Sequence, residues 1–201
     1  MKKLMMIAAL MVATLSASAR NEVGQLTLQP KVGINIANVT GDIAIDKKSK
    51  VGFVAGFEAE YGISEIFGLD FGVLYSMEGF KAKGIGIGGY GTSAYLVDAN
   101  YNLDYINIPI LAQVYPVKGL AIKAGIQPAF NVRHKVSADD AKATIDGIKS
   151  FNFSIPVGLS YEYECFVLDA RYNIGVTKII KHLDEGCNST FSITLGYKFP
   201  L

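Results

Sequence analysis

The stretch VGFVAGFEAEYGISEIFGLDFGVLYSMEGF, residues 51–80, decides the fold class because its apolar side chains recur at every second position. The apolar series runs from Val51 to Ile63 and resumes from Phe67 to Met77, and most positions between its members carry glycine, acids or polar residues. A period of two is typical of β-strands with one apolar and one polar face. The stretch therefore predicts two adjacent strands joined by a short connection at Ser64-Glu65.

The same alternation recurs along most of the chain and predicts eight strands. We expect them at residues 26–36, 51–63, 67–77, 101–115, 120–132, 151–161, 166–176 and 191–199. Most are ten or more residues long, which suits a membrane crossing, since a tilted strand needs roughly 9–11 residues. Four prolines lie inside these segments, where each lacks a ladder donor, so we interpret them as bulges or strand ends. They are Pro30, Pro109, Pro128 and Pro156.

The connections between the expected strands alternate in length. The short ones lie at residues 64–65, 116–119 and 164–165, and the long ones at about 38–50, 81–100, 135–149 and 177–189. Short turns on one rim and long loops on the other are typical of outer-membrane barrels. The sequence therefore predicts an all-β, eight-stranded, antiparallel, up-and-down transmembrane β-barrel, with both termini facing the periplasm.

Alternation alone does not say which face points outward, and a soluble lipocalin-like carrier would point its apolar face inward. Three features favour the membrane barrel. Glycine is frequent on the polar face, where it leaves room for long charged neighbours in a narrow interior. Aromatic residues gather near the strand ends on the apolar face, as in interfacial girdles. Acids and bases on the polar face nearly balance, as enclosed charges must.

These polar-face charges form the predicted lumen network, in which acids and bases pair inside the barrel. Its eleven members are Lys31, Glu58, Glu60, Asp70, Glu78, Lys123, Arg133, Glu162, Asp169, Arg171 and Lys198. An eight-stranded barrel has an interior that side chains can fill. We therefore expect a plugged barrel, with a narrow passive porin for small solutes as the alternative.

The N-terminus has the three parts of a secretory signal peptide: a basic start, an apolar core and a small-residue cleavage site at Ala17-Ser18-Ala19. We expect residues 1–19 to be removed and residues 20–201 to form the barrel domain. Loss of Lys2 and Lys3 leaves 19 − 2 = 17 basic residues against 18 acidic ones. This near-neutral charge gives no electrostatic basis for binding nucleic acid.

The segment SITLGYKF, residues 192–199, resembles the C-terminal assembly signal of outer-membrane barrels, with Tyr197 and Phe199 as its terminal aromatics. It departs from that signal at Thr194, where glycine is usual, and in the trailing Pro200-Leu201. The resemblance implies recognition by the barrel-assembly machinery.

Three further segments carry a family resemblance: KVGINI at residues 31–36, NIPIL at residues 107–111 after Tyr105, and Gly125. With these segments in this order, the chain resembles the PorT-like outer-membrane β-barrel family, often labelled "porin family". The resemblance implies a location in the outer membrane of a Gram-negative cell. It implies no agreed activity and no catalytic residues.

The glycine-rich segment KGIGIGGYGTSAY, residues 83–95, fits the dinucleotide fingerprint G-x-G-x-x-G twice. Its glycines are Gly84, Gly86, Gly88, Gly89 and Gly91. The fingerprint needs a strand before it and a helix after it, but the following residues lead into a strand. We therefore expect no nucleotide cofactor, and we interpret the segment as the tip of an extracellular loop whose hairpin extends beyond the membrane.

Few residues suggest catalysis, metal binding or a disulfide. His134 and His182 fall near acids on the long-loop side, where an Asp–His pair could activate water, but polar residues are ordinary in such loops. Cys165 and Cys187 fall at opposite rims, too far apart for a bridge. We expect a non-enzymatic, monomeric protein without metal or cofactor. It would contact outer-membrane lipid and act structurally or through surface loops whose partner the sequence does not identify.

Overall fold

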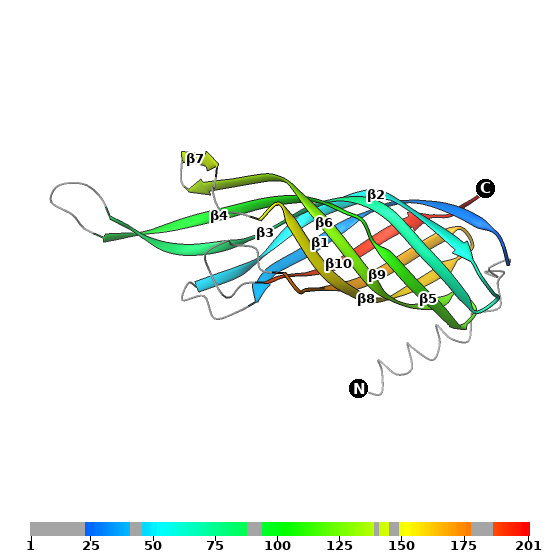
Figure 1. Cartoon of the computed structure of the whole chain (residues 1–201). Coiled ribbons are helices and arrows are strands. Elements are labelled where there is room, and N and C mark those ends of the chain that lie inside the picture. Colours follow the sequence, from blue (N-terminus) through cyan, green and yellow to red (C-terminus); the bar gives the residue numbers. More distant parts are fainter. Residues whose placement is uncertain (1–22, 41–45, 88–93, 139–140, 145–148, 178–186) are drawn as a thin grey trace, which may run out of the picture.

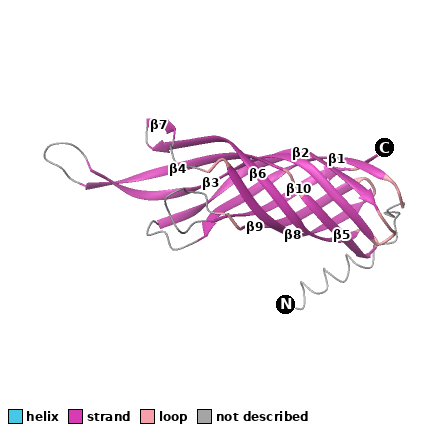
Figure 2. Ribbon diagram, in the orientation of Figure 1, coloured by secondary structure: helices cyan, strands magenta, loops and turns pink. Residues whose placement is uncertain are grey.

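The computed structural model describes residues 23–40, 46–87, 94–138, 141–144, 149–177 and 187–201. All regular structure in these residues is β-strand (Figures 1 and 2). The strands are β1 (Leu26–Thr40), β2 (Asp46–Gly62), β3 (Phe67–Ile87), β4 (Ala94–Asn107), β5 (Ile110–Val117), β6 (Leu120–Ala138), β7 (Ala141–Thr144), β8 (Phe151–Tyr163), β9 (Phe166–Gly175), β10 (Cys187–Tyr197) and β11 (Phe199–Pro200). The predicted signal peptide, residues 1–19, lies outside the described residues.

The strands close into one antiparallel barrel. Neighbours along the chain pair in order, and β10 pairs back onto β1, with Val32 opposite Leu195. The barrel has eight strand positions because β4 and β5 share one of them, between β3 and β6. The short β7 and β11 only extend existing ladders on β6 and β1. The predicted eight-stranded up-and-down barrel is confirmed.

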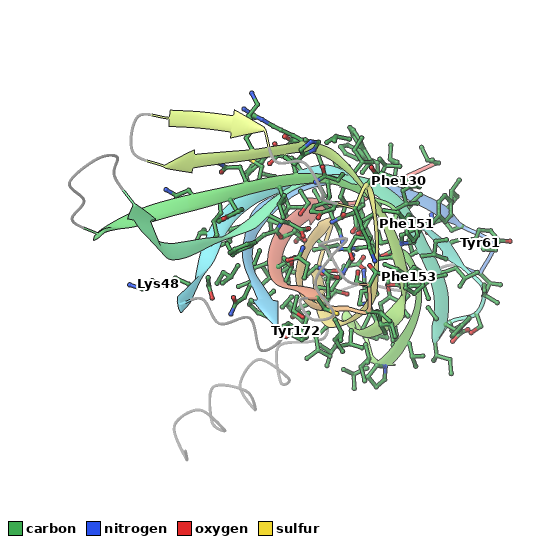
Figure 3. All side chains as sticks on the ribbon, turned by 60° about the vertical axis from the view of Figure 1, so that its left-hand side comes forward. Lys48, Tyr61, Phe130, Phe151, Phe153 and Tyr172 are labelled. Atoms are coloured by element: carbon green, nitrogen blue, oxygen red, sulfur yellow. The ribbon has the colours of Figure 1, made fainter. Side chains whose placement is uncertain are left out.

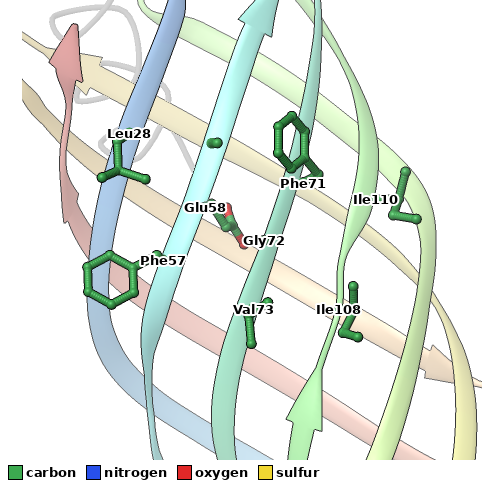
Figure 4. Close-up of a pocket in the computed structure, with 9 residues that line it drawn as sticks. Leu28, Phe57, Glu58, Phe71, Gly72, Val73, Ile108 and Ile110 are labelled. Atoms are coloured by element: carbon green, nitrogen blue, oxygen red, sulfur yellow. The ribbon is translucent and has the colours of Figure 1, made fainter. Parts of the chain in front are cut away.

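The apolar face points outward and the polar face points into the barrel. In β2, Phe57 is 59% exposed whereas Glu58 is 1% exposed, and the same contrast recurs around the wall. A soluble carrier would show the reverse, so the lipocalin-like alternative is wrong. Figure 4 shows part of this wall, where Leu28, Phe57, Phe71 and Ile110 border a recess of about 580 Å³ that we expect lipid hydrocarbon to fill.

Two of the expected strands are interrupted, and β1, β2, β6 and β10 run past their expected ends. The expected strand 101–115 is interrupted at Ile108-Pro109, where β4 ends and β5 begins. Proline cannot donate to a ladder, but its carbonyl still accepts a hydrogen bond from Gly72 at 3.1 Å. The last expected strand also breaks, at Lys198. Pro30, Pro128 and Pro156, by contrast, lie within continuous strands.

The segment predicted as a loop at residues 81–100 is largely strand. The β3–β4 pairing continues until Ile87 lies opposite Ala94, and the hairpin projects well past the rest of the barrel (Figure 1). Gly84 and Gly86 therefore lie in β3 rather than in a loop, while Gly88, Gly89 and Gly91 lie outside the described residues. The extended hairpin agrees with the expectation that this region continues beyond the membrane.

Aromatic side chains lie outward near both ends of the wall. Toward the short turns, Phe166 and Tyr197 meet edge to face at 5.2 Å between ring centroids, and Tyr197 packs on Phe199 at 4.7 Å. Toward the other end, Phe130 and Phe151, both labelled in Figure 3, meet edge to face at 5.6 Å between ring centroids. The arrangement matches the two interfacial girdles of a membrane barrel. No described residues form a helix long and apolar enough to cross a membrane.

Candidate functional site

Six buried charges fill the middle of the barrel, and we call them the central cluster. They are Lys31 of β1, Glu58 of β2, Asp70 of β3, Lys123 of β6, and Asp169 and Arg171 of β9. Each is at most 4% exposed. Because inward positions alternate with outward ones along every strand, the barrel brings together residues that lie up to 138 positions apart in the sequence. Three bases face three acids, so the cluster carries no net formal charge.

Arg171 bridges two acids of the central cluster. Its guanidinium binds both carboxylate oxygens of Glu58, with nitrogen–oxygen distances of 2.9 and 3.2 Å. The same group donates to Asp169 at 3.0 Å. Such two-pronged contacts are the strongest form of charged hydrogen bond in proteins. Arg171 therefore holds β2 and β9 together across the lumen.

The two lysines complete the central cluster. Lys31 lies 2.6 Å from Glu58 and 3.2 Å from Asp169. Lys123 lies 2.8 Å from Asp70 and 3.3 Å from Asp169. Asp169 is thus shared by all three bases. Every member has an opposite charge beside it, which is what enclosed charges require.

A second group, the rim cluster, lies toward the short turns and consists of Lys198, Glu60, Glu162 and Tyr115. The ammonium of Lys198 lies 2.7 Å from Glu60 and also pairs with Glu162. Tyr115 donates to Glu60 at 2.6 Å. The rim cluster therefore fills the lumen between the central cluster and the short turns.

Glu78 lies on the other side of the central cluster, among neutral partners. Its carboxylate accepts hydrogen bonds from Ser76 at 2.7 Å, Asn107 at 3.2 Å, Thr190 at 3.3 Å and also from Asn188. No basic side chain among the described residues forms an ion pair with it. Its setting therefore differs from that of the other lumen acids.

Arg133 lies outside the lumen, which corrects its predicted place in the network. Its side chain is 53% exposed and lies 3.6 Å from the buried carboxylate of Asp104. The cause is a bulge in β6: Asp104 pairs with Arg133 and Tyr105 pairs with Asn131, so Val132 has no opposite residue. One extra residue reverses the faces of all residues that follow. The other ten predicted residues point into the barrel.

Sequence reasoning missed several lumen residues. Tyr115 alternates with the apolar face of its strand, so its period alone could have placed it inside. Asn35, Asn107, Asn173 and Asn188 also lie inside, at most 6% exposed. They lie on the polar face of their strands, but the predicted lumen network contained only charged residues. Asp104 is not a lumen residue: it lies opposite Met77 on the outward face, and its carboxylate accepts a hydrogen bond from Tyr75 at 2.6 Å.

Two glycines on the polar face allow close approach of neighbouring groups. Gly72 leaves room for Glu58, since a Cβ on Gly72 would lie 2.6 Å from Cγ of Glu58. Gly125 serves the backbone instead, because a Cβ there would lie 2.1 Å from the carbonyl oxygen of Ile110 in the neighbouring strand. Glycine on the polar face therefore both accommodates charges and lets strands curve tightly.

Histidines and cysteines form no reactive group in the part of the chain that the structure describes. His134 lies 3.1 Å from the side-chain oxygen of Asn131, and His182 is outside the described residues. Cys165 follows β8 in a short turn, whereas Cys187 begins β10 at the opposite end, and no disulfide joins them. Within the described ranges, no three His, Cys, Asp or Glu residues are placed to hold a metal.

Comparison with known proteins places this architecture in a family. Residues 16–181 match the family described as "Outer membrane protein beta-barrel domain". The chain belongs to this family. Barrels of this family lie in the outer membrane in contact with its lipid, and so does this protein. The match does not extend to the PorT-like assignment, which stays a prediction.

Solved structures of other small barrels are similar in fold. Neisserial surface protein A is 17% identical, with a TM-score of 0.54 over 87% of this chain and 97% of that one. The attachment invasion locus protein Ail of Yersinia pestis, in complex with the heparin analogue sucrose octasulfate, is 16% identical, with a TM-score of 0.51 over 89% and 100%. A search of curated protein sequences gave no match.

Proposed function

We propose that this outer-membrane barrel does not conduct solutes and instead presents its long β3–β4 hairpin for interactions at the cell surface. One observation carries the proposal: β3 is 21 residues long, about twice the roughly 9–11 residues that a crossing needs, while the lumen below it is filled by ion pairs. The β3–β4 hairpin thus extends beyond the membrane, while the ion pairs close the path through the barrel. The PorT-like assignment, a monomeric state and recognition by the assembly machinery fit this proposal.

The filled lumen supports the non-conducting part of the proposal. The central and rim clusters occupy successive levels of an eight-stranded barrel, whose interior is only wide enough for side chains. Each central charge is at most 4% exposed, so none lines a hydrated path.

We expect the refolded protein, without residues 1–19, to be silent in planar lipid bilayers, because ion pairs occlude its lumen. Insertion is verified separately by the mobility difference between unheated and heated samples on gels. Steady, reproducible openings in inserted protein would contradict the proposal and establish the narrow-porin alternative.

The hairpin part of the proposal requires that the long-strand end faces outside the cell. We expect Lys83→Cys, placed in a Cys165→Ser/Cys187→Ser background, to react on intact cells with a membrane-impermeant maleimide. The matched variant Lys118→Cys, in the short β5–β6 turn, should react only after the cells are permeabilised. The reverse pattern would mean that the hairpin faces the periplasm, and the surface role would be lost.

A catalytic role finds no support in the described residues. His134 contacts an amide oxygen rather than an acid, so it lacks the partner that would make it a general base. We therefore propose that the protein is not an enzyme.

A further inference from the structure

A small polar cavity lies inside the barrel, on the hairpin side of the central cluster. Its volume is about 10 Å³, which is room for about one water molecule or one small ion. It is lined by Glu78, Asn107, Gln127, Ala129, Asn152, Ser154, Asn173, Asn188 and Thr190. The lining therefore combines one carboxylate with neutral amides and hydroxyls.

The carboxylate of Glu78 has no counter-charge beside it among the described residues. Glu78 is 4% exposed, and the four hydrogen bonds it accepts come from uncharged donors. The ammonium of Lys50 binds the main-chain oxygen of Glu78 at 3.1 Å and Oδ1 of Asn102 at 2.6 Å, rather than the carboxylate. A buried carboxylate without a compensating charge is costly.

Three amide oxygens of the same lining lack hydrogen-bond donors. They are the Oδ1 atoms of Asn107, Asn173 and Asn188, on side chains that are 4%, 6% and 3% exposed. The amide groups of Asn107 and Asn188 already donate to Glu78, and that of Asn173 donates to Ser192 at 3.5 Å. Because the NH₂ groups of these amides already donate hydrogen bonds, their oxygen atoms remain as acceptors without a donor. The cavity thus presents oxygen atoms in need of a positive partner.

We propose that this cavity binds one small monovalent cation of the size of sodium. Hard cations prefer carboxylate, amide and hydroxyl oxygens, which are the groups present here. A single carboxylate matches a single positive charge. A water molecule could donate to two of the oxygens but would leave the charge of Glu78 uncompensated. A cation would both contact the amide oxygens and balance the charge of Glu78. The bound ion would complete the filling of the lumen above the central cluster.

A ligand that binds only the folded state raises its stability as the ligand concentration rises. We expect the thermal unfolding midpoint of the protein in detergent to increase by about 5 °C over about a hundredfold range of NaCl concentration. Choline chloride keeps the ionic strength constant. Glu78→Gln, which keeps the shape but removes the charge, should abolish the sodium-dependent shift. Glu164→Gln, an exposed acid in the β8–β9 turn, is the matched control and should behave as the unchanged protein.

Thallium(I) locates the ion directly. Crystals grown with thallium in place of sodium should show an anomalous peak between Glu78 and Asn173, and Glu78→Gln crystals should lack it. If Glu78→Gln does not fold, Asn173→Ala removes one oxygen, keeps the charge and should weaken the sodium-dependent shift. Unchanged protein with no anomalous peak and no sodium-specific shift would overturn the proposal, whether the cavity then holds water or Glu78 is protonated.

Discussion

Replacing Arg171 with methionine is expected to lower the free energy of unfolding by about 3–5 kcal/mol. Arg171 binds Glu58 at two points and Asp169 at a third. Methionine fills much of the space but supplies no charge. Three acids would then face two lysines inside the barrel, and an uncompensated buried charge is far more costly than the pair was favourable. The measurement is urea unfolding in lipid vesicles, followed by far-UV circular dichroism, because the chain has no tryptophan.

The matched control is Lys118→Met in the short β5–β6 turn of the same barrel. Lys118 is exposed, and substitutions at such surface positions usually change the free energy of unfolding by less than about 0.5 kcal/mol. The double variant Glu58→Gln/Arg171→Met restores equal numbers of acids and bases in the central cluster. It should recover a large part of the stability lost in Arg171→Met. Equal losses in Arg171→Met and Lys118→Met would show that the central cluster does not stabilise the barrel.

The wall of the barrel could be predicted from the sequence because a strand in lipid needs a period of two along its whole length. Residues 51–80 already show this period and the position of the turn. The period also tells which residues share a face. The inward orientation of Lys31, Glu58 and Arg171 follows from it.

The partners within the lumen could not be predicted. A period of two shows which face of the strand a residue lies on, but not its position along the barrel axis. Lys31 meets Asp169 through the register of β1, β10 and β9, in which Gly33 lies opposite Thr194 and Thr194 opposite Asp169. That register results from packing around the whole barrel. The sequence likewise gives no sign of the bulge at Val132, which moved Arg133 to the outer surface.

Strand ends were predicted less well, for a different reason. The length that a membrane requires indicates where a strand crosses lipid, but a hairpin can continue into water. β3 does so through residues 81–87, whose glycines and lysines resemble those of a loop, and these residues pair with residues 94–100 of β4. Paired backbone outside the membrane needs no apolar face, so the periodic signal fades before the strand ends.

The outward-facing wall supplies the second large effect, which depends on depth in the membrane. Val157 lies at the middle of β8, 40% exposed, beside Ala124 and Tyr172 of the neighbouring strands. Arginine at the midplane of a barrel's lipid face costs about 2–4 kcal/mol. We expect Val157→Arg to lose stability by this amount when unfolding is measured in phospholipid vesicles.

Tyr163→Arg provides the comparison on the same strand and the same face. Tyr163 is 54% exposed and ends β8, six residues or about 20 Å along the strand from Val157. A charge there reaches the headgroups, so its cost should fall to about 0–1 kcal/mol. In water, both positions would accept arginine at little cost. A difference between the two variants therefore measures the hydrocarbon layer itself, and equal costs would mean that this wall does not face lipid, whatever fills the lumen behind it.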